Sequence, residues 1–372
     1  MKRAVTILVT ILAACLTFSL PAAAHSPQQA PHQSYSEGDL KLESGEVIKD
    51  FSISYVTHGK LNDKKSNAIL MVTAISGNHH RIDFMIGPGK ALDTDKYFIV
   101  CTDAIANGLT TSPSNSKAQP RMQFPKFTIR DMVQSQYRLM KEKLGIDHVV
   151  AVVGPSMGGM QVLQWGVSHP DYMDALVAMV PLAKTPAWSI AVMESSRKAI
   201  MLDPAWKDGN YDAPPEKGIR LWRDILTFLS ARTPDMYAAQ FKNGLDILPW
   251  LESQETALLK VFDANDWIYQ TWAYDRHDVG TTPGFNGDTA KALGSIKAKT
   301  LILTGTKDLL NPEFEPIEAG KNIAGAKIMT ISPGTVTGHA AAGGAISADV
   351  EFINRETATF LDIVTEGGKK LD

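Results

Sequence analysis

The chain has 372 residues, of which 44% are hydrophobic, and a formal net charge of −3. This composition is typical of a globular protein with a large hydrophobic core. Basic residues form no run and do not alternate with aromatic ones, so we expect no nucleic-acid partner.

Residues 1–24 are predicted to be a signal peptide. A basic start at Lys2 and Arg3 is followed by an apolar span over 4–20 and by the small-residue sequence PAAA, the order in which export signals are built. We therefore expect cleavage after Ala24 and an exported protein, either periplasmic or secreted. The apolar span is short for a retained membrane anchor, so no stable membrane span is expected after processing.

A second feature of the same segment gives an alternative way of processing it. The sequence LAAC, which ends at Cys15, resembles the lipobox of bacterial lipoproteins. Anchoring through an acylated Cys15 is the less favoured alternative, because the residues after it stay apolar. Cleavage after Ala24 would leave Cys101 as the only cysteine and would rule out an intramolecular disulfide.

Residues 25–37 are polar and contain proline, and they are predicted to be a flexible linker that leads to the first strand. Beyond them, apolar runs alternate with helical stretches, of which 128–144 is the clearest because apolar residues recur every three or four positions. Buried strands joined by helices predict an α/β fold with a mostly parallel central sheet flanked by helices. The predicted strands lie at 68–76, 97–105, 148–154, 175–182, 300–304 and 327–332.

The alternation of strands and helices breaks over residues 184–293. This stretch consists of helical segments rich in Trp, Met and Arg. We interpret it as a helical cap inserted into a core that comprises residues 38–183 and 294–372. Because the insertion follows a predicted strand, it is expected to cover the strand ends and to form the roof of a pocket.

The stretch 149–161, VVAVVGPSMGGMQ, predicts a nucleophilic serine. An apolar strand runs into Gly-x-Ser-x-Gly, where Gly154 and Gly158 allow the sharp turn that presents Ser156 above the sheet. Helical spacing resumes directly afterwards. The amides and the dipole of that helix start would favour an oxyanion beside Ser156.

A serine hydroxyl needs a neighbouring base, which is held in turn by a third group. In the α/β-hydrolase fold these groups follow in the order Ser, Asp or Glu, and His. Here the strand-like sequence LILTGTKD ends at Asp308, and KIMTISPGTVTGH ends at His339. The sequence therefore predicts a catalytic triad of Ser156, Asp308 and His339, in which Asp308 fixes the tautomer of the histidine.

The predicted oxyanion hole uses two backbone amides. One belongs to Met157, which follows the serine, and the other to Ile75, where the predicted strand at 68–76 gives way to a loop. His79 and His80 lie in that loop, but no third ligand follows at a useful spacing. We assign no metal and no cofactor.

Five dispersed stretches resemble the homoserine O-acetyltransferase family of α/β-hydrolases. The resemblance implies that Ser156 accepts the acyl group and that Asp308 and His339 are its catalytic partners. It also implies that Ile75 and Met157 line the oxyanion hole. Family members often form homodimers through the cap, although nothing in this sequence itself establishes an oligomer. The stretches are LESGEVIKDFSISYVTHGKLN (42–62), FPKFTIRDMVQSQ (124–136), GPSMGGMQ (154–161), SSRKAIMLDPAW (195–206) and FDANDW (262–267).

The chain departs from this family at two positions that would contact homoserine. The resemblance implies an acidic residue directly after the histidine, where it meets the substrate amine, but the residue here is Ala340. The family's Thr-Tyr-Arg-Ser motif, whose arginine meets the substrate carboxylate, is absent in its usual form. In LTFLSART the nearest arginine is Arg232, which is out of register and is carried over only as a candidate substrate-binding residue.

We therefore expect a serine-dependent enzyme that hydrolyses a small acyl ester through an acyl-serine intermediate. One alternative is an O-acyltransferase with an acceptor other than water. Homoserine acetylation itself is less favoured, because Ala340 removes the countercharge and because acyl-CoA and homoserine are cytoplasmic metabolites. A binding protein whose triad is idle is the alternative from another functional class.

Overall fold

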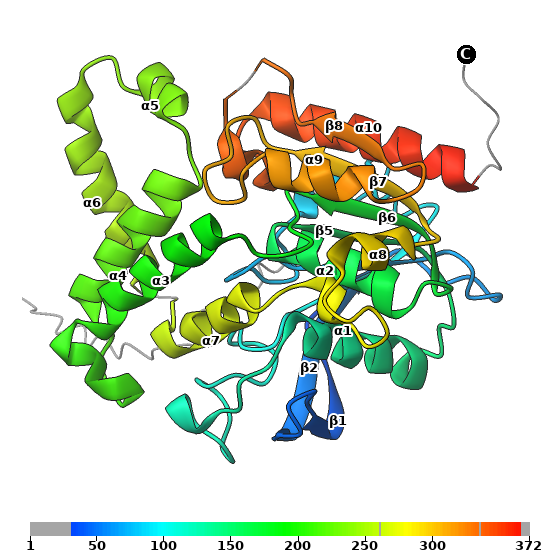
Figure 1. The fold of residues 1–372 in the computed structure, drawn as a ribbon, viewed down its shortest axis with the longest axis horizontal. Coiled ribbons are helices and arrows are strands. Elements are labelled where there is room, and N and C mark those ends of the chain that lie inside the picture. Colours follow the sequence, from blue (N-terminus) through cyan, green and yellow to red (C-terminus); the bar gives the residue numbers. More distant parts are fainter. Residues whose placement is uncertain (1–30, 260–261, 335, 366–372) are drawn as a thin grey trace, which may run out of the picture.

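The computed structural model describes residues 31–259, 262–334 and 336–365 (Figure 1). Its centre is one eight-stranded sheet with the strand order β1-β2-β4-β3-β5-β6-β7-β8. Every pair from β4 to β8 is parallel, and only β1 and β2 run antiparallel to their neighbours. The strands are β1 (Gln33–Lys41), β2 (Val47–His58), β3 (Ala68–Val72), β4 (Phe98–Thr102), β5 (Val149–Pro155), β6 (Met173–Met179), β7 (Lys299–Thr304) and β8 (Lys327–Thr330).

The six predicted strands correspond to β3 through β8, which confirms the mostly parallel α/β-hydrolase sheet. Successive residues of a strand face opposite sides of the sheet. In β3, Leu70 and Val72 belong to one core cluster, whereas Ile69 and Met71 belong to the other. Both faces of the sheet are therefore buried. Helices α1 (Ile129–Arg138), α2 (Met157–Ser168) and α9 (Phe314–Lys321) supply the first cluster, and α10 (Ser347–Thr365) supplies the second.

The predicted linker needs a correction at its C-terminal end. Residues 33–37 form the first half of β1, which pairs with β2 so that Gln33 faces Tyr55 and Tyr35 faces Ile53. Most side chains of β1 are exposed, so this edge strand carries little of the apolar signal by which strands are recognised in a sequence. Residues 25–30, the predicted signal peptide and Cys15 lie outside the described residues.

The predicted cap is an insertion between β6 and β7 (Figure 1). Lys184 and Asp278 pair in an isolated antiparallel bridge that closes the two ends of the insertion. The segment 279–293, predicted as cap, instead packs on the core, where Thr282 Oγ1 accepts a hydrogen bond from Gln164 of α2 at 2.9 Å. The helices of the insertion are α3 (Ala187–Met201), α4 (Glu216–Arg223), α5 (Pro234–Gln240), α6 (Ile247–Leu258) and α7 (Ala264–Asp275), with α8 (Thr289–Gly294) after the bridge.

The long predicted helix at 128–144 is shorter in its regular part. A capping box of Thr128 and Asp131 begins α1, and a wide π-helical turn over Leu139–Lys143 continues it. Gly145 follows with a φ of 61°, which is the left-handed conformation that ends helices. In the described part of the chain, no helix has both the length and the apolar character that crossing a bilayer requires.

Glu37 of β1 makes the stability of this edge dependent on pH. Its buried Oε2 lies 3.2 Å from Nη1 of Arg138, yet burial raises the pKa of Glu37 from 4.5 to about 8. The folded chain therefore binds a proton that the unfolded chain releases between about pH 4.5 and pH 8. The contribution of this carboxyl to stability is accordingly lost as the pH rises through that window.

We expect the unsubstituted protein to lose stability relative to Glu37→Gln as the pH is raised from 5 to 9, because an amide cannot ionise. The free energy of unfolding of Glu37→Gln minus that of the unsubstituted protein should therefore increase over this range. Urea unfolding of both proteins at several pH values measures the difference. A difference that stays constant with pH would contradict the raised pKa of Glu37.

Candidate active site

Ser156 stands at a strained turn between β5 and α2. All residues of β5 are buried, and Ser156 follows with φ 57° and ψ −120°, a conformation that costs free energy and is concentrated at functional sites. Its amide donates a hydrogen bond to the carbonyl of Met179 in the adjacent β6 at 2.8 Å. The turn is thereby fixed to the centre of the sheet.

The glycines on either side of Ser156 are required by backbone contacts. A Cβ atom at Gly158 would lie 2.5 Å from the carbonyl oxygen of Val72, and one at Gly154 would lie 2.8 Å from the same oxygen. Because this oxygen belongs to the backbone of β3, it cannot move aside as a flexible side chain could. The Gly-x-Ser-x-Gly spacing therefore reflects the close packing of the turn on β3.

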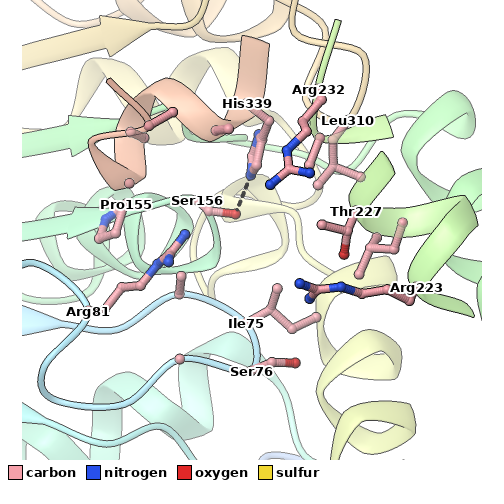
Figure 2. A pocket seen from close by; sticks show the side chains of 18 of the residues that line it. Ile75, Ser76, Arg81, Pro155, Ser156, Arg223, Thr227, Arg232, Leu310 and His339 are labelled. Atoms are coloured by element: carbon pink, nitrogen blue, oxygen red, sulfur yellow. Dashed lines mark hydrogen bonds between the residues drawn. The ribbon is translucent and has the colours of Figure 1, made fainter. Parts of the chain in front are cut away.

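The three predicted triad residues meet in space, and Figure 2 shows two of them, His339 and Ser156, joined by their hydrogen bond. His339 lies after β8, in a short 3-10 turn, and its Nε2 is 2.7 Å from Oγ of Ser156. Its Nδ1 is 2.7 Å from Oδ2 of Asp308, which follows β7. Oδ1 of Asp308 accepts two backbone amides, from Leu310 and Asn311, at 2.8 Å each. This is the geometry of a nucleophile, a base and an orienting acid.

The two predicted oxyanion-hole residues flank this serine. Met157 is the first residue of α2, where backbone amides have no partner within the helix, and its side chain is buried in the core. Ile75 lies on the loop after β3 and lines the same cavity as Ser156. These positions allow both amides to serve an oxyanion that forms at a carbonyl bound to Ser156.

The loop that carries Ile75 is held at both of its ends. The amide of Ser76 donates to Oε1 of Gln270 in α7 at 2.9 Å, and the amide group of Gln270 donates to the carbonyl of Ile105 at 3.1 Å. Farther along, the buried His79 is bound to Asp103 through its backbone amide at 2.9 Å and its Nδ1 at 2.6 Å. A cap helix and a core carboxylate therefore share the positioning of this loop.

His80, which follows His79 in the chain, also has a carboxylate partner. His80 Nδ1 lies 2.8 Å from Oδ2 of Asp83, so the two histidines contact different acids. Across residues 31–259, 262–334 and 336–365, no three His, Cys, Asp or Glu side chains are grouped so that they could hold a metal ion.

A cavity of about 480 Å³ opens in front of Ser156 and His339. This volume is within the range of sites for small molecules. The loop after β3 forms one wall, the cap forms the opposite wall, and the small residues after His339 form a third. The lining includes Ala74, Ile75, Ser76, Gly77, Trp222, Leu226, Thr227, Met236, Phe262, Leu310, Ala340, Ala342, Gly343 and Ala345.

Among the described residues, three arginines also line this cavity, and the sequence predicts only one of them. Arg232, the candidate from the cap, lies there with its guanidinium 5.0 Å from the ring centre of Trp250. Arg223 lies nearby, where burial and then the charge of Arg232 lower its pKa. Arg81 enters from the core side (Figure 2). No local pattern in the sequence distinguishes Arg81 and Arg223 from surface arginines, because only the fold brings them to Ser156.

The contact of Gln270 with the loop makes a testable prediction. Gln270→Leu leaves the amide of Ser76 and the carbonyl of Ile105 without their partners, so the Ile75 amide loses its fixed position. We expect the rate at which a fluorophosphonate probe labels Ser156 to fall by about tenfold or more, because such probes also develop charge in an oxyanion hole.

The matched control is Gln164→Leu. Gln164 is equally buried on α2 and donates to Ser168 and Thr282 at 2.9 Å each, away from the cavity. Each variant is expected to lose about 1–3 kcal/mol of stability through unpaired polar groups, but only Gln270→Leu should slow labelling. Equal labelling rates in the two folded variants would show that Gln270 does not position the loop.

Comparison with known proteins places this site in a family. Residues 67–333 match the family model described as the alpha/beta hydrolase fold. A homoserine O-acetyltransferase of Methanosalsum zhilinae is 38% identical in an alignment 312 positions long, which covers 75% of this chain and 62% of that protein. This chain thus spans less than two thirds of the length of that relative.

Two further relatives are matched over most of their length. A homoserine O-acetyltransferase of Nostoc punctiforme is 34% identical in an alignment 308 positions long, which covers 78% of this chain and 86% of that protein. The solved structure of the acetyl esterase MekB has a TM-score of 0.84 and 28% identity, and the match covers 89% of this chain and 97% of that one. The chain is therefore an enzyme that belongs to the homoserine O-acetyltransferase-like family of the α/β-hydrolase superfamily.

Proposed function

We propose that this enzyme hydrolyses a small acyl ester through an acyl-serine intermediate. The observation that carries the proposal is the hydrogen-bonded series from Ser156 through His339 to Asp308, which opens onto the cavity. In this arrangement His339 takes the hydroxyl proton while Oγ of Ser156 attacks the carbonyl carbon. The amides of Ile75 and Met157 stabilise the oxyanion that forms.

The second half of the reaction reuses the same groups. When the bond between the acyl carbon and the alcohol oxygen breaks, His339 returns its proton to the departing alcohol. A water molecule then gives a proton to His339 and attacks the acyl-serine, and the carboxylic acid leaves as Ser156 regains its proton. Asp308 keeps the imidazole oriented and stabilises its charged form in both halves.

The residues around His339 favour water over homoserine as the acceptor. Ala340 lines the cavity where the family resemblance implies an acid, and no Asp or Glu is among the described residues that line it. An ammonium group in this cavity would have no countercharge and would face three arginines. The likeness of the fold to that of an acetyl esterase supports the same reading.

Acyl transfer to an acceptor other than water is the second candidate. Two relatives with 34% and 38% identity are named as homoserine O-acetyltransferases. A smaller cavity of about 210 Å³, lined by Asp263 and Asp266, shares Ser76 and Phe262 with the main cavity. An acceptor that carries an amine could reach these two acidic groups on that side.

Product analysis distinguishes these candidates. We expect the purified mature chain to release acid from a short 4-nitrophenyl ester without an added acceptor. Ser156→Ala should lower kcat by at least about 10⁴-fold, because nucleophile and base act as a unit. Turnover that requires an alcohol, with negligible hydrolysis, would identify a transferase, and efficient acetylation of homoserine by acetyl-CoA would overturn the interpretation of Ala340.

A folded protein that neither turns over esters nor reacts with a fluorophosphonate at Ser156 would indicate that the chain is a binding protein whose triad is inactive. Circular dichroism and cooperative thermal unfolding verify that the protein used in this comparison is folded.

We also propose that the enzyme acts outside the cytoplasm, on the basis of the export signal in residues 1–24. We expect the mature protein, expressed with its own N-terminus in a Gram-negative host, to appear in the periplasmic or secreted fraction and to begin at His25. Mass spectrometry of the intact protein measures this. A mass that corresponds to a lipid-modified Cys15 would support anchoring instead, and an uncleaved cytoplasmic chain would contradict export.

A further inference from the structure

Arg81 is a cation of the cavity that the proposed mechanism does not use. It lies on the loop between β3 and a short 3-10 turn at Asp83–Met85, and its side chain is directed toward Ser156 (Figure 2). The side chain remains exposed to the cavity, although the surrounding protein lowers its pKa from the usual value. A guanidinium nevertheless stays protonated in proteins, so Arg81 brings a full positive charge close to the serine.

The wall of the cavity next to this guanidinium has a glycine, Gly343, where a side chain would collide with it. A Cβ atom at Gly343 would lie 2.9 Å from Nη2 of Arg81 and 3.3 Å from its Cζ. Gly343 belongs to the small-residue segment AAAGG that directly follows His339. Any larger residue at this position would displace the guanidinium, so the segment that carries the histidine also allows Arg81 to lie in the cavity.

In the part of the chain that the structure describes, no acid neutralises this charge. Within the described residues, none of the ion pairs that form within 4.0 Å includes Arg81, and the nearest acid along the chain, Asp83, is bound by His80 at 2.8 Å. The described residues that line the cavity include no Asp or Glu either. A guanidinium that faces the cavity without a protein partner keeps its donors available for a negatively charged ligand.

We propose that Arg81 determines specificity by binding a carboxylate group of the ester substrate, an inference that rests on the proposed function. Arg81 approaches Ser156 from the core side, whereas Arg223 and Arg232 come from the cap side (Figure 2). The planar guanidinium fork binds a carboxylate with two parallel hydrogen bonds. The cavity thus selects an anionic ester over a neutral ester of the same size.

The carboxylate can belong to either part of such an ester. It can be the free end of a dicarboxylic acid whose other end is esterified, or it can belong to the alcohol part, as in an acylated hydroxy acid. Both present the same group to Arg81. Two anionic probes distinguish these sources, namely the mono-4-nitrophenyl ester of succinic acid and 4-acetoxybenzoate, with 4-nitrophenyl acetate and phenyl acetate as their neutral counterparts.

We expect Arg81→Gln to lower kcat/KM for one of the anionic probes by about 10- to 100-fold, the usual effect of losing hydrogen bonds to a charged group. The neutral counterparts should change by less than about threefold. Arg81→Lys keeps the charge but not the fork, and it should give an intermediate value for the same probe. The anionic probe that responds identifies the part of the substrate that carries the carboxylate.

Arg355→Gln is the control for net charge, because Arg355 lies on α10, has a side chain that is 60% exposed and is absent from the cavity lining. It should leave the ratio of anionic to neutral kcat/KM unchanged. An Arg81→Gln variant that loses neutral and anionic activity equally, or that loses neither, would overturn the inference.

A binding measurement tests Arg81 independently of turnover. Succinate should protect Ser156 from the fluorophosphonate probe, and Arg81→Gln should require about tenfold more succinate for the same protection. Equal protection of both proteins, or protection of neither, would count against Arg81. If neutral esters are still hydrolysed in that case, only this inference fails, whereas a folded protein without labelling or hydrolysis would refute the proposed function itself.

Discussion

The left-handed backbone at Ser156 is the constraint on which the rest of the site depends. With φ at 57°, the chain leaves β5 and enters α2 within a single residue, so the hydroxyl and the first free helix amide stand side by side. The conformation persists because the Ser156 amide is bound to β6 and because Gly154 and Gly158 pack against the backbone of β3. Three adjacent strands therefore hold one strained residue, and the surrounding sheet offsets its cost.

The cap is joined to both loops that approach Ser156, which makes it more than a cover for the cavity. Gln270 of α7 binds the loop after β3. On the other side, the amide of Ala340, next to His339, donates to the carbonyl of Ala231 in the cap at 3.0 Å. A displacement of the cap would consequently shift the oxyanion side and the histidine side together. This coupling explains how a peripheral insertion can control the geometry at the centre of the sheet.

A structural feature could be predicted from the sequence where residues that are neighbours in the chain carry its pattern. The parallel strands and the positions of Ser156, Asp308 and His339 could be read because each lies in or just after a continuous apolar run in a fixed chain order. Neither β1 nor β2 is predicted from the sequence, and for β1 the reason is that its exposed edge carries few apolar residues. Arg81 and Arg223 gave no signal, since they are 142 positions apart (223 − 81) and become neighbours of Ser156 only through folding.

The charges of the cavity connect the departure at Ala340 with the choice of substrate. Ala340 stands where the family resemblance implies an acid for a substrate amine, and the three arginines around the same space raise the cost of placing any cation there. The same arginines lower the cost of negative charge in a partly desolvated site. Negative charge develops on the carbonyl oxygen during attack by Ser156, and it is permanent on a carboxylate product. In the proposed function, these charges therefore favour ester cleavage that ends in an acid over transfer to an acceptor that carries an ammonium group.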